Sequence, residues 1–324
     1  MATNFTTSNA ISQREDLANW ISNISRDMTP FISSIGKSKA TATTHEWTTD
    51  TLQAPATQAA AEASDYAVST SPVMTRLTNI TQIFTKGINV SGTLEAVDKA
   101  GRKSEFKYQS EKRGKEMQRD IEKTMVGSQV RTASASASGN IQAGARLMGA
   151  YKSYTQTACV NAGAGTLTKA TGDGTDVPTW TTGAAAAITL ADINEVLRLT
   201  NGSTSAAPSI VMMSTTQKVA FSTLINAGTG TNVRRNIDER GKLRQSIDLY
   251  ESDFGDVEVK HNYIQGESEI LIYDPSFLAM ATLRPTHFRD INEAGDALRS
   301  YMVQELTFEA KNPEGNGIIV NATV

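Results

Sequence analysis

DVEVKHN at 256–262 and EILIY at 269–273 begin a run of strand-like segments that continues with FLAMATL at 277–283, VQELTFE at 303–309 and GIIVNATV at 317–324. Each segment is continuously apolar or alternates apolar with polar residues, and Gly, Pro, Asn or Asp separates it from the next. Such a pattern is typical of β-strands. The last third of the chain therefore predicts a rigid sheet, with the final segment tied into it.

A smaller group of helices and a strand precedes this sheet. Two amphipathic helices are predicted at 190–199 and 215–225, on either side of the apolar strand at 209–213. Helices beside strands indicate an α+β architecture. Residues 128–187 are rich in Ala, Gly, Ser and Thr, which bury too little apolar area to order themselves, so we expect loops there, with a helical interlude at 146–151.

The most strongly predicted helix covers residues 91–127, a stretch without proline and dense with charge. Pairs such as Glu95 with Lys99 have the favourable i,i+4 order, which stabilises an exposed helix by about 0.2–0.5 kcal/mol each. Unbroken, roughly 36 residues would span about 54 Å, so the helix would cross the molecule as a largely solvated beam. Gly101 and Gly114 weaken the prediction of continuity, because each costs about 1 kcal/mol relative to alanine.

Two segments near the start of the chain have apolar faces but too few residues for a core of their own. An amphipathic helix with Trp20 on its apolar stripe is expected before Pro30. Thr-rich alternation at 41–48 and 75–85 predicts a long two-stranded hairpin whose strands are joined by small and polar residues. Because an isolated hairpin is marginal in water, both segments need another surface to rest on.

Composition excludes several classes of function. The formal net charge of −3 provides no global basic field for nucleic acid. Cys159 is the single cysteine, cannot form an intramolecular disulfide, and is interpreted as a small buried residue. Neither an apolar run of membrane-spanning length nor a signal peptide is recognisable, so the protein is expected to be made and used without crossing a membrane.

No catalytic or cofactor-binding set emerges from the sequence. The histidines His45, His261 and His287 lie on separate segments without the spacing of metal ligands. An S-x-x-K match at 34–37 lacks its companion motifs, and the glycines at 163–165 lack the rest of a dinucleotide site. We therefore expect no enzymatic activity, no cofactor and no metal.

Short motifs distributed along nearly the whole chain resemble one known family. In chain order they are Asp16-Leu17 to Thr29-Pro30-Phe31 with Ile35-Gly36, Glu46 to Leu52, Tyr250 to Gly255, Asp274-Pro275, Leu283-Arg284-Pro285, Gly295-Asp296-Ala297, and Asn312-Pro313 to Gly317-Ile318-Ile319. Their order and spacing resemble the tailed-phage major head protein family typified by phage SU-ten. The resemblance implies the α+β Hong-Kong-97 capsid fold, and the independently predicted order of segments agrees with that plan.

On this resemblance the chain divides into five parts. They are an N-terminal arm at 1–36, an extended-loop hairpin at 37–90, a peripheral domain with a spine helix at 91–180, an axial domain at 181–283 and returning peripheral strands at 284–324. The implied function is that of a structural major capsid protein that self-assembles into the icosahedral head shell around phage DNA. A phage fibre or spike-type host-binding module is the alternative, although fibre repeats are absent and the charged helix fits such a fold poorly.

The resemblance also implies partners and a location. The protein would contact copies of itself in hexamers and pentamers, the portal, a separate scaffolding or decoration protein, and packaged double-stranded DNA without sequence specificity. A separate scaffolding protein is expected because some relatives carry a long helical N-terminal extension as built-in scaffold and this sequence shows none. No membrane partner is expected; the protein would reside in the virion capsid after assembly in the host bacterial cytoplasm.

Large apolar side chains of the arm and hairpin are the expected inter-subunit contacts, because a few such side chains usually dominate an interface. They are Trp20, Trp47, Leu77, Ile80 and Phe84. The alternative is that they pack within their own subunit.

Covalent cross-linking of the shell is not expected. Some proteins with this fold join a lysine of the extended loop to an asparagine of a neighbour. Here Lys86 lies at the root of the hairpin, and the tip at 52–71 contains no lysine. The asparagines of the terminal segment are interpreted as solvated; they are Asn312, Asn316 and Asn321.

Overall fold

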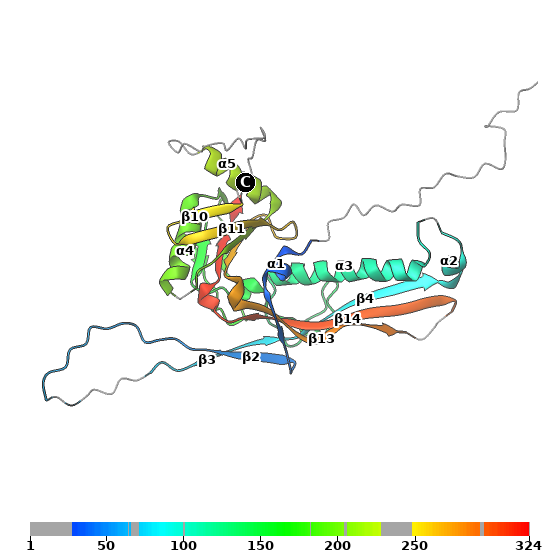
Figure 1. Ribbon diagram of the computed structural model, residues 1–324, viewed down its shortest axis with the longest axis horizontal. Helices are drawn as coiled ribbons and strands as arrows, with labels where there is room; N and C mark the ends of the chain where they lie inside the picture. The colour runs from blue at the N-terminus through cyan, green and yellow to red at the C-terminus, as the bar shows by residue number, and fades with distance from the viewer. Residues whose placement is uncertain are drawn as a thin grey trace, which may run out of the picture.

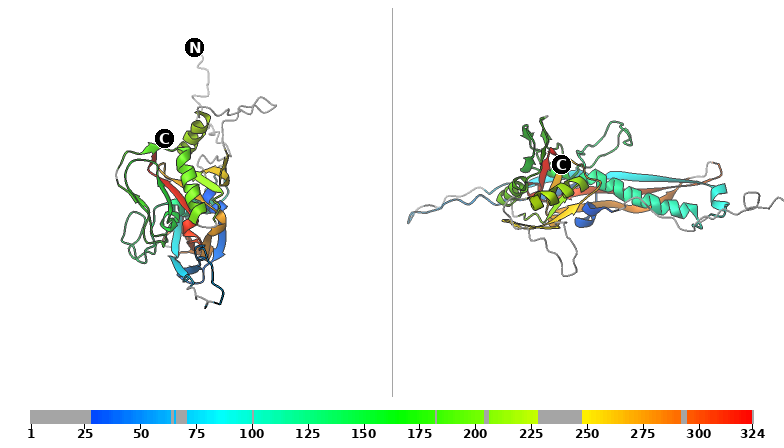
Figure 2. Two further views of the ribbon diagram at one scale, coloured as in Figure 1. Left: turned by 90° about the vertical axis from the view of Figure 1, so that its left-hand side faces the viewer. Right: turned by 90° about the horizontal axis from the view of Figure 1, so that it is seen from above.

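The computed structural model describes residues 28–63, 65, 71–99, 101–181, 183–203, 206–227, 248–291 and 295–323. The molecule is elongated, with a lobe of sheet and helices standing on one end of a long sheet that carries a helix along one face (Figure 1). A hairpin projects beyond the lobe in one direction, and the long sheet extends in the other (Figures 1 and 2). Mixed helix and sheet confirm the expected α+β class.

The long sheet has four strands in the order β1-β13-β14-β4. They are β1 (Gly36–Lys39), β13 (Leu278–Asp290), β14 (Ala297–Ala310) and β4 (Gln82–Ser91). Strands β13, β14 and β4 pair antiparallel, and β1 adds to β13 in parallel. Helix α3 (Glu105–Val126) lies along one face of this sheet (Figure 1), where its Met117, Ile121 and Met125 join a buried cluster with Leu306 and Phe308 of β14.

The lobe contains a six-stranded sheet in the order β10-β11-β9-β12-β15-β5. Its strands are β10 (Leu249–Ser252), β11 (Gly255–His261), β9 (Ile210–Met213), β12 (Ile270–Tyr273), β15 (Gly317–Val320) and β5 (Ala158–Asn161). Every residue of β9, β12 and β15 is buried. In β12, Ile270 and Ile272 contribute to one apolar cluster, while Leu271 and Tyr273 contribute to the other. Burial on both faces explains the continuously apolar sequences of these strands.

Two helices cover the six-stranded sheet, as the sequence predicted. Helix α4 (Leu190–Ser203) supplies Ile193, Val196 and Leu197 to the cluster that contains Ile272, and α5 (Thr215–Ala227) supplies Phe221. No helix within the described ranges is long and apolar enough to span a membrane.

The remaining elements are short. They are the hairpin of β2 (Thr44–Thr49) and β3 (Thr75–Ile80), the pairs β6 (Leu167–Thr168) with β7 (Thr179–Trp180) and β8 (Ala186–Ala187) with β16 (Ala322–Thr323), helices α1 (Pro30–Ser34) and α2 (Gly92–Ala96), and the 3-10 turns η2 (Tyr151–Tyr154), η3 (Pro275–Phe277) and η4 (Pro313–Gly315).

The prediction of one continuous helix over 91–127 is wrong. The chain forms α2, leaves helical geometry at Val97, and begins α3 only at Glu105. Gly101 has φ = 78°, whereas a right-handed α-helix needs a negative φ, so a helix cannot continue through this residue. Glycine adopts such a positive φ readily because it has no Cβ atom. With 22 residues, α3 spans about 33 Å rather than 54 Å.

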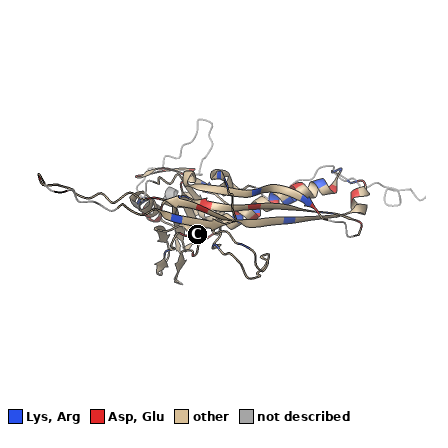
Figure 3. Ribbon diagram, turned by 90° about the horizontal axis from the view of Figure 1, so that it is seen from below, with Lys and Arg blue, Asp and Glu red and all other residues tan. Residues whose placement is uncertain are grey.

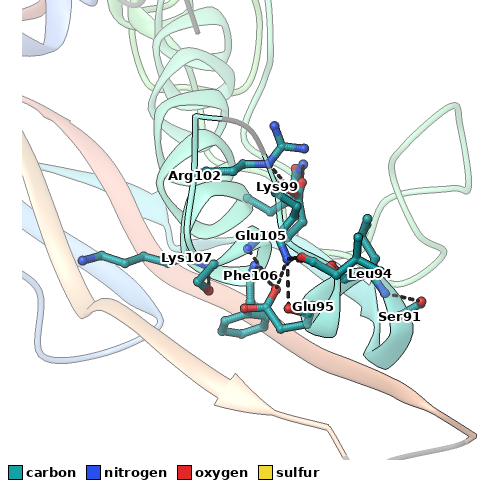
Figure 4. Close-up of polar contacts among 11 residues, drawn as sticks. Ser91, Leu94, Glu95, Lys99, Arg102, Glu105, Phe106 and Lys107 are labelled. Atoms are coloured by element: carbon teal, nitrogen blue, oxygen red, sulfur yellow. Dashed lines mark hydrogen bonds and ion pairs between the residues drawn. The ribbon is translucent and has the colours of Figure 1, made fainter. Parts of the chain in front are cut away.

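Polar side chains stabilise the break between α2 and α3 (Figure 4). Ser91 and Ser104 cap the two helices, accepting hydrogen bonds from the amides of Leu94 and Lys107 at 3.2 Å each. The carboxylate of Glu95 accepts from the amides of Glu105 and Phe106, at 2.9 and 3.2 Å. The helix ends are therefore satisfied locally, which removes the main cost of interrupting the helix.

Gly114 does not break α3, contrary to the weakness expected there. A methyl group at this position would meet the Cε atom of Met302 at 3.6 Å, an ordinary contact distance. The helix thus passes β14 closely at Gly114, and packing against the sheet outweighs the low helix propensity of glycine.

The helical interlude predicted at 146–151 lies elsewhere. Leu147 forms a bridge with Thr132, and the turn η2 begins only at Tyr151. Tyr151 and Tyr154 are fully buried, and the Tyr151 hydroxyl donates to the carbonyls of Ile272 and Gly317 at 2.8 and 2.9 Å. The low-complexity region therefore contributes two aromatic core residues that its overall composition obscures.

Sheet membership crosses the divisions expected from the resemblance. The cut at 36/37 falls inside β1, and the cut at 283/284 falls inside β13. Strand β15, expected with the peripheral strands, pairs with β12 and β5 in the six-stranded sheet. The chain passes between the two sheets more than once, and the division into five parts stays a prediction.

Candidate functional site

The hairpin of β2 and β3 is firmly attached at its root. The indole Nε1 of Trp47 donates to the carbonyl of Ala310 at 2.8 Å, and His45 Nε2 lies 3.2 Å from the Glu309 carboxylate. Asn79 is fully buried; its Nδ2 donates to the carbonyl of Phe308 at 2.6 Å, and its Oδ1 accepts from the Gly149 amide at 2.8 Å. These contacts fix the base of the hairpin to β14.

Beyond this root, the hairpin has little to pack against in its own subunit. Leu52 is 97% exposed, Val73 87% and Met74 64%, and they flank the connection between the two strands. The expected polar connection thus carries apolar side chains at its base, which the sequence reasoning missed. The sequence did contain a sign of these exposed side chains. Large apolar residues occur there beside Pro and Thr, in a segment without the alternation of a strand that could bury them.

The five expected contact residues are placed differently from one another. Leu77 is buried at the hairpin root, opposite Trp47, which is partly buried against the main cluster. Phe84 lies in β4 rather than in the hairpin, and it is buried in the subunit's own core. For Leu77 and Phe84, packing within the subunit is the observed arrangement, because both side chains are already covered. Ile80 is half-buried, and Trp20 lies outside the described residues.

A buried carboxylate on β14, that of Glu305, connects three other segments of the chain. Glu305 of β14 is buried and accepts hydrogen bonds from Arg146, Arg284 and Thr81, at 2.5, 2.6 and 2.8 Å. The two guanidinium groups that face this carboxylate compensate for the hydration that it loses on burial. The pairing of β13 with β14 is irregular on both sides of Arg284, so the interactions of Glu305 stabilise a bulged stretch of the sheet.

Charged residues of both signs recur along helix α3 (Figure 3), and some of them form pairs such as Arg113 with Glu116 at 2.6 Å. Lys86 of β4 pairs with Asp120 at 2.5 Å, which ties the helix to the sheet. The helix was expected to be largely solvated; Glu105 and Glu122 are exceptions, because their side chains are buried.

The structure shows the surroundings of two groups that were considered for chemistry, Cys159 and His287. Burial raises the pKa of the Cys159 thiol to about 12, and the predicted burial of this residue is confirmed. His287 Nδ1 lies 2.9 Å from the carbonyl of Pro285. Across the described part of the chain, no cluster of three His, Cys, Asp or Glu side chains could hold a metal ion.

Solved structures that are similar to this chain include a phage capsid and the capsid of a GTA particle. The chain matches the capsid asymmetric unit of cyanophage A-1(L) with a TM-score of 0.68 at 11% identity, covering 98% of this chain and 99% of that one. It matches the capsid of a native GTA particle with a TM-score of 0.62 at 11% identity and 98% coverage of each chain, and a Mycobacterium phage Bobi chain with 0.61 at 11% identity, covering 98% and 99%. At such identities the likeness defines the fold, which is the Hong-Kong-97 capsid fold.

Sequence comparison defines the family. The model of the SU10 major capsid protein family matches residues 1–323. A major capsid protein of Escherichia phage Phieco32 is 39% identical over 116 residues, which is 36% of this chain; the match spans 33% of that protein's length. The chain therefore belongs to the SU10 major capsid protein family, as the motifs indicated, and the fibre or spike alternative is not favoured.

Proposed function

We propose that this protein builds the icosahedral head shell of a tailed phage by self-assembly into hexamers and pentamers. The observation that carries the proposal is the contrast within the hairpin, whose root is hydrogen-bonded to β14 while Leu52, Val73 and Met74, just beyond its two paired strands, are exposed. Apolar side chains on an extended arm are covered when a second copy lies beneath them.

Assembly in this proposal depends on many modest contacts. The N-terminal arm with Trp20, the hairpin with Trp47 and Ile80, and the six-stranded lobe would each meet a different neighbour. Linked contacts that close into rings and a shell give collective strength without any single tight interface. The mechanism is multivalent binding between copies, and no reaction is required of the chain.

Further partners follow from the same role. A shell needs a portal at one vertex, and a separate scaffolding or decoration protein would help to set its curvature. Packaged double-stranded DNA would be contacted through its phosphates without sequence specificity. Assembly would take place in the host bacterial cytoplasm, and the finished protein would reside in the virion.

Negative-stain electron microscopy of the purified full-length chain, with light scattering, tests the proposal. Capsomers, shells or tubes of regular diameter are expected once the chain is concentrated. A monodisperse monomer at high concentration, with both the hairpin and the N-terminal segment protected from protease, would contradict it.

A further inference from the structure

Glu122 is a buried acid that the proposed assembly surfaces leave unused. It lies on α3, one turn from the helix end, and its exposed fraction is 0%. Its Oε1 accepts from the amide of Phe31 at 2.8 Å, its Oε2 accepts from the amide of Ile32 at 2.9 Å, and Asn262 Nδ2 donates to Oε1 at 2.7 Å. Burial raises the pKa of the Glu122 carboxyl above its ordinary value, against these hydrogen bonds.

The two amides belong to α1, where the N-terminal segment enters the folded subunit. Thr29 occupies the N-cap position of α1 but makes no side-chain cap hydrogen bond. Pro30 has no amide hydrogen, so Phe31 and Ile32 carry the first free N–H groups of the helix. A carboxylate about 90 residues away in the sequence therefore replaces the usual local cap.

Helix α1 also contacts both sheets. Phe31 is fully buried, with its ring 5.2 Å from that of Tyr273 in β12 and 6.1 Å from that of Phe308 in β14. Ser34 Oγ lies 2.8 Å from the Tyr273 hydroxyl. The root of the N-terminal arm is thus wedged where the four-stranded sheet, the six-stranded sheet and α3 meet.

Asn262 connects this anchor to the lobe. It follows β11 directly, and its backbone amide donates to the carbonyl of Met213 in β9 at 2.8 Å. The same turn is held to α3 by Arg119, whose guanidinium lies 5.9 Å from the centre of the Tyr263 ring. A shift of the six-stranded lobe relative to α3 therefore acts on the carboxylate that holds α1.

From this geometry we infer that Glu122 is a positioning residue for assembly: it fixes where the N-terminal arm leaves the subunit and, through Asn262, couples that exit to the orientation of the six-stranded lobe. The inference rests on the proposed shell-forming function. A rigid root matters because an arm that reaches a neighbour binds more strongly when its starting direction is set in advance.

Glu122→Gln and Asn262→Ala test the inference, with Glu116→Gln as the matched control on the same helix. Glutamine offers one acceptor oxygen in place of two, and its amide nitrogen would face an N–H donor. Hydrogen exchange of the Phe31 and Ile32 amides should therefore accelerate roughly tenfold or more in Glu122→Gln. In Asn262→Ala the same amides should accelerate several-fold, although the Asn262 side chain bonds the carboxylate rather than α1.

Assembly provides the second readout. Both variants should give fewer closed shells or a broader range of diameters, and Glu116→Gln should match the unmodified chain. Amide exchange within twofold of the unmodified chain in Asn262→Ala would overturn the coupling, and this variant decides the matter if Glu122→Gln does not fold. Faster exchange with normal shells would overturn the positioning role. Failure of the unmodified chain to assemble would instead count against the proposed function. Amide exchange in the isolated subunit would still test whether Glu122 and Asn262 hold α1.

Discussion

The central strands of the six-stranded sheet are almost wholly apolar, whereas the strands of the β2–β3 hairpin are rich in threonine; both compositions favour strands, yet the two regions are stabilised in different ways. Strands β9, β12 and β15 are buried at every position, between one cluster that includes α4 and α5 and another that includes η2. Strand β2 alternates between exposed and half-buried residues. Both regions therefore have residues that favour strands. They differ in burial, because the sheet is covered on both faces by other parts of the subunit and the hairpin is not.

Deleting Gln53 to Ser69 should have the largest effect on function and almost none on the subunit. The deletion removes the reach of the hairpin while its hydrogen-bonded root at Trp47 and Asn79 remains. The unfolding free energy should stay within about 0.5 kcal/mol of that of the unmodified chain, because residues 53–63 are exposed and contribute little to the core. Closed shells should disappear from electron micrographs, and normal shells from this variant would show that the hairpin does not cross to a neighbour.

Ile272→Ala should be the most damaging point substitution for the subunit itself. Ile272 is fully buried in β12, and removing its side-chain methyl groups leaves a cavity that costs about 2–5 kcal/mol. Leu52→Ala in the hairpin is the control, since Leu52 is 97% exposed and its loss should change the unfolding free energy by less than about 0.5 kcal/mol. Urea unfolding of both variants measures the contrast; equal losses would refute it.

Trp47→Phe should have an intermediate effect at the junction of the two regions. Phenylalanine keeps an aromatic ring but loses the hydrogen bond from Nε1 to the carbonyl of Ala310. The expected loss is about 1 kcal/mol. Protease cleavage within the hairpin should become faster, whereas Thr48→Ser, on the exposed face of β2, should leave the rate unchanged. Unchanged cleavage in Trp47→Phe would mean that other contacts alone hold the root.

Lys86→Ala should have the smallest effect, because we expect no covalent cross-links between subunits. Lys86 pairs with Asp120 of its own subunit at 2.5 Å. The interpretation of Asn316 and Asn321 as solvated is wrong, because both are buried, and Asn316 Nδ2 donates to the carbonyl of Tyr154 at 3.0 Å. Assembled shells boiled in denaturant should run as one band at the monomer mass, with or without Lys86→Ala. A ladder of multimers that resists reductant and disappears in Lys86→Ala would contradict this prediction.

Sequence reasoning succeeded where side-chain pattern and local structure coincide. The alternation at 75–85 and the apolar runs around Ile210, Ile270 and Ile318 predicted strand structure, and the structure shows that the last three strands are buried at every position. It failed at Phe84, because β3 and β4 are separated by the single residue Thr81 and their combined pattern reads as one strand of a hairpin. Which strand pairs with β14 depends on residues more than 200 positions away.

The amino-acid sequence by itself determined the family, the α+β class and the approximate position of most strands, because short-range periodicity and motif order are local properties of the chain. Only the tertiary structure decided that the charged helix begins at Glu105, that Glu122 is buried against α1, and that β15 belongs to the six-stranded sheet. The burial of Glu122 and the pairing of β15 depend on partners distant in sequence: the amides of Phe31 and Ile32 for Glu122, and strands β12 and β5 for β15. The start of α3 depends on nearby caps, Ser104 and Glu95, but the charge pattern is equally compatible with a continuous helix, so only the structure distinguishes the two.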